Sequence, residues 1–211
     1  FYPVIDVGYL LAPRGVGTMF AMMLVGRLSG RVDVRILILL GLLLTSFSMW
    51  EMTLFNTDIS SWDIVRTGIV QGLGLGFIFV PLSTITFATL APRYRNEGTA
   101  LFSLVRNIGS SIGISVVITY LAQRTQMNHE VFASYITPFN AGLQQGMGTA
   151  ALVTPKGLAM LNGEVTRQAS LLAYLQDFRL MMWVSLCAIP LVLLLKAPKR
   201  GGGKEALAIL E

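Results

Sequence analysis

The stretch ILILLGLLLTSFSMWEMTLF, Ile36–Phe55, decides the fold class, because its twenty residues carry a single formal charge, Glu51. About 20 apolar residues in a helix, at 1.5 Å each, cross the roughly 30 Å hydrocarbon core of a bilayer. The whole chain has the same character, with 54% hydrophobic residues, 13% charged residues and a mean hydropathy of +0.65. A soluble domain is about a quarter charged. We therefore expect an all-α integral membrane protein.

Four further apolar runs are long enough to span, which makes five expected transmembrane helices. The four are Gly8–Leu28, Ile64–Leu90, Thr99–Leu121 and Phe178–Leu195. Residues 122–177 form a long connection before the last span, and residues 196–211 form a basic tail. The run that contains Pro81 is longer than a span needs, so we expect a kink or a strong tilt there.

The charges of the connections predict the orientation. Basic residues gather in the first connection, in the third connection and in the tail: Arg31, Arg35, Arg93, Arg95, Lys196, Lys199, Arg200 and Lys204. The connection 56–63 on the other side holds Asp58 and Asp63 and no Lys or Arg. Basic loops stay in the cytoplasm, so the C-terminus is expected there. This placement also explains the net charge of +5 without nucleic acid as a partner.

The connection 122–177 is then extracytoplasmic. From Leu158 onward apolar residues recur near helical spacing: Leu158, Leu161, Val165, Leu172 and Leu175. We interpret this part as an outward-facing amphipathic helix that lies on the outer surface and runs into the last span. Two alternatives stay open, a helix that caps the bundle and a docking site for a partner such as a periplasmic adaptor protein.

Arg106 is the one formal charge in the run Thr99–Leu121 and lies about 10 Å along the helix from its cytoplasmic end. Its side chain could snorkel to that interface. Arg106, Gly109 and Gly113 share one helical face, however, so glycine-mediated packing would turn Arg106 into the bundle. We favour the interior placement. If the protein carries a solute across the membrane, the candidates for the substrate pathway or for proton coupling are Arg106, Asn107, Gln71 and Arg14.

Glycine and proline in the spans are interpreted as packing and kink positions. The set is Pro13, Gly15, Gly17, Gly72, Gly74, Gly76, Pro81, Gly109 and Gly113. Small residues let membrane helices approach closely, and such seams can also slide during alternating access. The G-x-G-x-G run at Gly72 is no nucleotide loop, because no strand precedes it.

The segment GRLSGRVDVR, Gly26–Arg35, resembles the loop signature G-x-L-x-D-R-x-G-x-R of the major facilitator superfamily. Gly26, Arg31 and Arg35 match this signature, as does the leucine between them. Asp33 stands at the second glycine of the signature, and a glycine replaces its acid. The resemblance implies a charge latch for one transporter conformation, formed by Gly26, Arg31, Asp33 and Arg35.

Four segments in family order resemble the C-terminal half of EmrB/QacA-type multidrug:proton antiporters, which have fourteen spans. They are LLAPRGVGTM, QGLGLGFIFVPLSTITFATLAP, SLVRNIGSSIGIS and TRQASLLAYLQDFR. The resemblance implies the last five spans of a major facilitator fold in a bacterial cytoplasmic (inner) membrane, with the N-terminal half of the polypeptide missing. It further implies membrane lipids and a small-molecule substrate as partners, and a proton gradient as energy source without a cofactor.

The acidic residues lie near span ends or in loops, so a coupling carboxylate is expected in the missing half. One cysteine, one histidine and no carboxylate pair on one face argue against an enzyme or a metal site. We expect the C-terminal part of a proton-driven efflux transporter that exports drugs or other amphipathic small molecules by alternating access. The alternatives are an exporter of one endogenous metabolite and a truncated, non-transporting membrane anchor.

Overall fold

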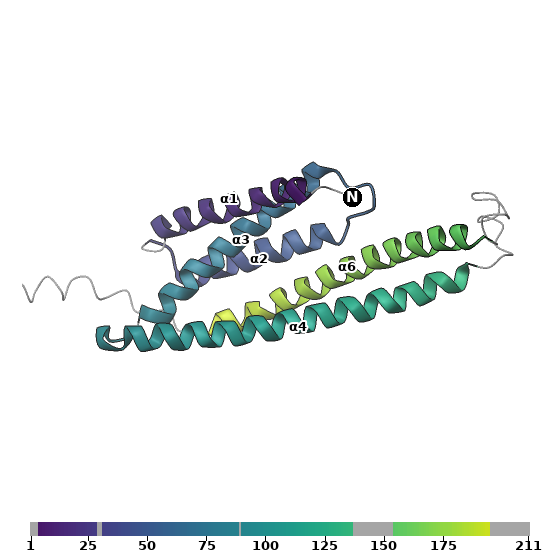
Figure 1. Cartoon of the computed structure of the whole chain (residues 1–211). Coiled ribbons are helices and arrows are strands. Elements are labelled where there is room, and N and C mark those ends of the chain that lie inside the picture. The colour runs from purple at the N-terminus through teal and green to yellow at the C-terminus, as the bar shows by residue number, and fades with distance from the viewer. Residues whose placement is uncertain (1–3, 29–30, 89, 137–153, 195–211) are drawn as a thin grey trace, which may run out of the picture. The chain divides into compact units, whose positions relative to one another are not determined.

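The computed structural model describes residues 4–28, 31–88, 90–136 and 154–194 (Figure 1). Within these ranges all regular structure is helical. The elements are α1 (Val4–Leu28), α2 (Val34–Met52), α3 (Ser61–Ala88), the 3-10 helix η1 (Pro92–Tyr94), α4 (Arg95–Tyr135) and α6 (Pro155–Leu194). The five α-helices are long and apolar enough to cross a membrane. For the described residues, the predicted all-α membrane class is confirmed. The basic tail and residues 137–153 lie outside the described residues.

Local sequence explains where the helices begin. The Ser60 hydroxyl accepts a hydrogen bond from the backbone amide of Trp62 at 3.3 Å, which caps the start of α3. The Thr154 hydroxyl accepts one from the amide of Gly157 at 3.2 Å, directly before Pro155 at the first position of α6. Proline fits that position because its missing N–H would have no partner inside the helix.

The chain divides into two compact units. The first unit contains α1, α2 up to Met49, α3, the start of α4 up to Val105 and the end of α6 from Met182. Its core has two apolar clusters. One cluster consists of Ala21, Val25, Leu37 and Phe77, and the other of Val34, Ile38, Leu42 and Val192. The second cluster joins the end of α6 to α2, and the Ser46 and Ser185 hydroxyls share a 2.7 Å hydrogen bond there as well.

Glycines let α3 contact two helices of this unit through its backbone. On one face, a Cβ at Gly72 would meet the backbone of Arg14 and Thr18 in α1. On the opposite face, a Cβ at Gly74 would lie 2.9 Å from the backbone oxygen of Gly41 in α2. The spacing of two residues explains this division, because it turns a helix by about 200°. A side chain at either glycine would force the helices apart.

The second unit contains residues 50–59 and a helical hairpin, formed by α4 from Arg106 and by α6 up to Met181 (Figure 1). Asn128 donates to the backbone oxygen of Ala169 at 3.4 Å, and the His129 ring lies 3.0 Å from the Asn162 amide oxygen. These two hydrogen bonds join the helices side by side.

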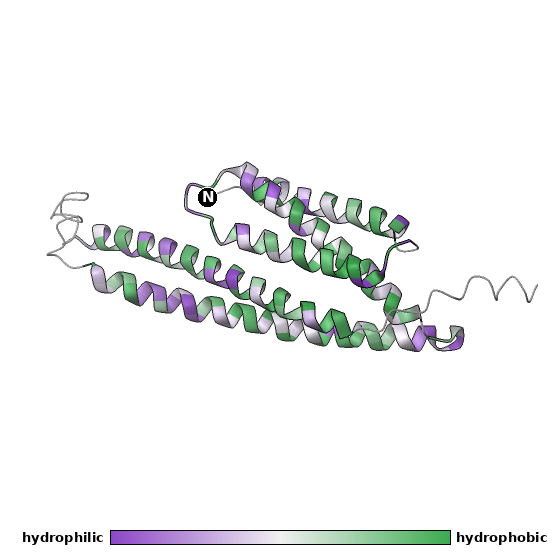
Figure 2. Ribbon diagram, turned by 180° about the vertical axis from the view of Figure 1, so that it is seen from behind, coloured by the Kyte–Doolittle hydropathy of each residue, from purple (hydrophilic) through white to green (hydrophobic). Residues whose placement is uncertain are grey.

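Both helices of the hairpin are longer than a membrane span. The 41 residues of α4 and the 40 of α6 would each measure about 60 Å at 1.5 Å per residue, roughly twice the hydrocarbon core. The end of the hairpin that contains the last turns of α4 and the first turns of α6 carries most of its hydrophilic residues (Figure 2). The predicted span ended at Leu121 because polar residues follow it. The helix continues to Tyr135 because the segment contains neither Gly nor Pro and packs against α6.

Candidate transport site

A polar stripe on α4 is the main candidate for a functional surface. At 100° per residue, six exposed polar residues fall within roughly 100° of the helix circumference. They are Asn96, Thr99, Ser103, Arg106, Asn107 and Ser110. We call this set the polar stripe of α4. No residue of α4 is buried by the described chain, so lipid, water or further protein must cover this face.

The hydroxyl groups of the stripe donate within the helix. Thr99 donates to the backbone oxygen of Arg95 at 2.8 Å, and Ser110 donates to that of Asn107 at 2.9 Å. Their oxygen lone pairs remain available to a ligand or to water. The Arg106 guanidinium adds a permanent positive charge to the middle of the stripe, where it can attract an anionic group.

The packing partner expected for Gly109 and Gly113 is not found in the described part of the chain, where nothing lies within 4 Å of a Cβ built at either position. The same holds for Gly15 in α1. By contrast, a Cβ at Gly17 would lie 2.7 Å from the backbone oxygen of Ile69, and one at Gly76 would lie 2.9 Å from that of Thr18. A role of Gly109 and Gly113 in orienting Arg106 therefore stays a prediction.

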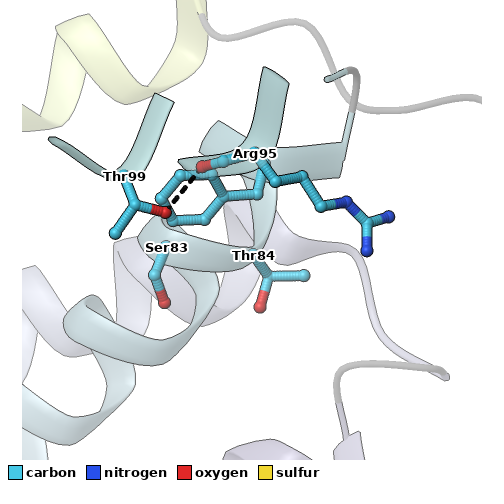
Figure 3. A pocket seen from close by; sticks show the side chains of 5 residues that line it. Ser83, Thr84, Arg95 and Thr99 are labelled. Atoms are coloured by element: carbon cyan, nitrogen blue, oxygen red, sulfur yellow. Dashed lines mark hydrogen bonds between the residues drawn. The ribbon is translucent and has the colours of Figure 1, made fainter. Parts of the chain in front are cut away.

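A hollow of about 620 Å³ lies where the end of α3 meets the start of α4 (Figure 3). It is lined by Ser83, Thr84, Phe87, Arg95 and Thr99, and we call it the α3–α4 hollow. Thr99 belongs to both the hollow and the polar stripe, so the two features are continuous. The Arg95 side chain extends away from the hydroxyl groups in Figure 3.

The walls of the hollow are fixed by local contacts. Ser83 and Thr84 both donate to the backbone oxygen of Val80, each at 2.9 Å. The rings of Phe87 and Phe102 meet edge to face at a centroid distance of 5.6 Å. This hollow was not predicted from the sequence. The short connection between the two spans was the available signal, because it brings the end of α3 next to the start of α4.

Gln71 lies elsewhere than the stripe. Its side chain is buried, with 6% exposed, and its amide nitrogen donates to the sulfur of Met49 at 3.8 Å. One turn away, the buried Ser48 hydroxyl donates to the backbone oxygen of Thr67 at 2.8 Å. Gln71 therefore belongs to a polar contact between α2 and α3.

Arg14 and the kink prolines lie on α1 and α3. The Arg14 side chain is exposed, and its backbone lies against α3. Pro13 is half-buried inside α1, whereas Pro81 is fully buried inside α3. Both helices continue past their proline, so the expected kink at Pro81 stays a prediction.

The loop motif lies between α1 and α2. Gly26, Arg31 and Asp33 are exposed, and Arg35 is half-buried. The Arg35 Nε is buried and has no hydrogen-bond partner in the part of the chain that the structure describes. The backbone oxygen of Asp33 accepts from Ile36 at 3.0 Å and so begins α2. The latch role of this motif stays a prediction. Among the described residues, no three His, Cys, Asp or Glu side chains form a group that could hold a metal ion.

Comparisons with known proteins identify the family. The model of the Major Facilitator Superfamily matches residues 2–134, so the chain belongs to this superfamily of multi-pass membrane transporters. A similar relative is the fatty acid resistance protein FarB of Neisseria gonorrhoeae, which is 29% identical over 202 residues, covering 93% of this chain and 39% of FarB. The multidrug export protein EmrB of Escherichia coli K12 is 23% identical over 209 residues, covering 96% and 40%.

A third relative is a multidrug resistance protein B homolog of Mycobacterium tuberculosis. It is 29% identical over 156 residues, which cover 72% of this chain and 28% of that protein. The chain thus spans about 40% or less of the length of the relatives it matches. The predicted relation to EmrB-type multidrug transporters is confirmed.

Proposed function

We propose that this chain is the C-terminal part of a proton-driven exporter of amphipathic small molecules that works by alternating access. The polar stripe of α4 carries the proposal. Polar and charged side chains on a membrane helix are costly against lipid and usually face the bundle interior or a water-filled cavity. A stripe with Arg106 at its middle is therefore suited to form one wall of a transport cavity.

The chemistry of the stripe favours amphipathic molecules with an anionic group. Arg106 offers charge, Asn107 offers an amide, and the surrounding residues of α4 are apolar. The α3–α4 hollow adds a second cation, Arg95, at the end where the stripe begins. The names of the relatives, fatty acid resistance and multidrug export, support this class of substrate.

The proposal includes a location and an energy source. The basic connections support a cytoplasmic C-terminus, and the bacterial relatives support a location in the inner membrane. The remaining spans of the full-length protein supply the opposite cavity wall, and the proton gradient supplies the energy without a cofactor. The part of the hairpin formed by α4 after Leu121 and by α6 before Phe178 then lies on the outer side of the membrane, where a periplasmic adaptor protein could bind it.

Efflux by cells that express the full-length protein tests this function. We expect export of several chemically distinct amphipathic substrates, lost when an uncoupler collapses the proton gradient. Arg106→Leu should lower efflux at least tenfold, whereas Arg106→Lys keeps the charge and should retain part of it. Arg66→Leu serves as a matched control, since Arg66 lies in the second turn of α3, near the outer end of its span. Unchanged efflux, expression and proton coupling in Arg106→Leu would rule out the cavity role.

A further inference from the structure

Asp177 is a buried carboxylate without a complete set of partners. Only 3% of the residue is exposed. Its Oδ1 atom is buried and has no hydrogen-bond partner among the described residues, and the same holds for Oε1 of the adjacent Gln176. Both atoms are acceptors. No hydrogen-bond donor of the described chain reaches Oδ1 of Asp177, which is an expensive arrangement for an ionised carboxylate.

The position of Asp177 in α6 makes the carboxylate unusual. Every fourth residue of α6 before it is buried, and each of these residues is small or apolar. The row is Gly157, Leu161, Val165, Ala169 and Ala173, and Asp177 is its sixth member. Each member lies about one turn after the previous one, and the row turns gradually around α6, by about 40° at each step. At Ala169 it meets α4, where the backbone oxygen accepts the hydrogen bond from Asn128. A carboxylate thus stands where the pattern calls for a small apolar side chain.

Protonation resolves the shortage of donors. An ionised carboxylate can only accept, whereas a protonated carboxyl group supplies one O–H donor and loses its charge. Removing the charge also removes most of the cost of burial. The neutral form of Asp177 therefore fits this site better than the ionised form.

The charged groups of the same unit come from α4, from residues 50–59 and from α6. On α4 these are Arg106, Arg124, whose guanidinium lies 5.0 Å from the centre of the Tyr120 ring, and, farther along, His129 and Glu130. Residues 50–59 contribute Glu51 and Asp58, and α6 itself contributes Lys156, Glu164, Arg167 and the exposed Arg179. Arg167 is engaged by Glu164 at 2.8 Å. None of the cations of the described chain forms an ion pair with Asp177 within 4.0 Å that could hold it ionised.

We propose that Asp177 is a proton-uptake residue of the exporter, an inference that rests on the proposed function. In the proposed orientation, Asp177 lies at the outer end of the last span. The ionised carboxylate accepts a proton from the outer solution, forming an O–H bond and leaving water. The proton is released when the exporter changes conformation, and the carboxylate is restored. A proton gradient directed inward can thus act on this residue.

The test uses the full-length protein in liposomes and compares two kinds of transport. Net transport is driven by a pH gradient, and substrate exchange is measured at equal pH on both sides. We expect Asp177→Asn to lower gradient-driven transport at least tenfold while exchange stays within about twofold of the wild type. The exposed acid on the same side, Asp58→Asn, is the matched control and should leave both unchanged.

The outcomes separate the inference from the function on which it rests. Absence of gradient-driven transport in the wild type would overturn the proposed function. Gradient-driven transport that stays at the wild-type level in Asp177→Asn would overturn the role of Asp177. A folded Asp177→Asn variant that loses substrate exchange as well as gradient-driven transport would also overturn it. If a sodium gradient drives transport in the wild type and this transport is abolished in Asp177→Asn, then the residue binds a metal cation instead of a proton, which would contradict the inference.

A second variant covers the case in which Asp177→Asn does not fold. Asp177→Glu keeps a titratable group but changes its reach and surroundings. If Asp177 carries the proton, the midpoint of the pH profile of gradient-driven transport shifts in this variant. An unchanged midpoint would contradict the inference.

Discussion

At the scale of single residues, the glycines that were all predicted to be packing positions differ in their surroundings. Gly72 and Gly74 contact the backbones of neighbouring helices, whereas Gly15 and Gly109 have nothing within 4 Å in the described chain. The amino-acid pattern shows that small residues are present in the spans. It does not show which partner each one faces, because that depends on how the helices cross.

Gly72→Ala is expected to destabilise the protein. The added Cβ would meet the backbone of Arg14 and lie 3.0 Å from the amide nitrogen of Thr18, and helix backbone cannot yield as a flexible side chain can. Overpacking of this kind typically costs about 1–3 kcal/mol. The measurement is thermal unfolding of the full-length protein in detergent. Gly15→Ala on the facing helix is the control, and equal melting temperatures for the two variants would contradict the packing described here.

Asn107 and Gln71 are expected to differ in their effect on export. Asn107 is exposed on the polar stripe, whereas Gln71 is buried against Met49. We expect Asn107→Leu to lower efflux several-fold, because it removes a polar group from the proposed cavity wall. Gln71→Met should keep efflux within about twofold, since similar volume is usually tolerated. The measurement is efflux by the two variants at matched expression. A larger loss of efflux in Gln71→Met than in Asn107→Leu would place Gln71 in the substrate pathway.

At the scale of helices, hydropathy predicted where the apolar runs lie but not where the helices end. The run Thr99–Leu121 was found because it is apolar, while the helix continues for fourteen further residues to Tyr135. That extension is polar and packs against the first half of α6. Hydropathy measures the fit to a bilayer, so it does not detect a helix that is stabilised by another helix.

The hairpin predicts a specific cross-link. His129 and Asn162 lie opposite each other, with 3.0 Å between their polar atoms. In a Cys187→Ser background, cysteines at both positions should be joined by a short bifunctional maleimide. Ala169→Leu should lower the yield several-fold, because Ala169 is fully buried and the larger side chain pushes the helices apart.

The control for the hairpin is Ala159→Leu, because Ala159 lies on the exposed face of the same helix. Its cross-linking yield should match that of the unmodified background. Equal yields for the Ala169 and Ala159 variants would mean that the two helices do not pack along the row of small residues.

At the scale of the whole molecule, the five membrane helices and the family could be predicted from the sequence, because long apolar runs and ordered segments are local features. The polar stripe of α4 was predicted only in part. Arg106 and Asn107 were identified as odd residues in an apolar run, but Ser83, Thr84 and Arg95 come together only through the turn between α3 and α4. A site formed across two helices depends on their packing, which a single run of residues does not contain.

Membrane orientation is the property of the whole molecule that follows most directly from charge. We expect Asp58→Cys to react with a membrane-impermeant maleimide on intact cells, because its connection lacks Lys and Arg. Tyr94→Cys, between Arg93 and Arg95, should react only after the membrane is permeabilised. Both variants are made in the Cys187→Ser background, which alone should give no labelling. The reverse pattern would place the basic connections outside, and would move Asp177 to the cytoplasmic side, away from the source of protons.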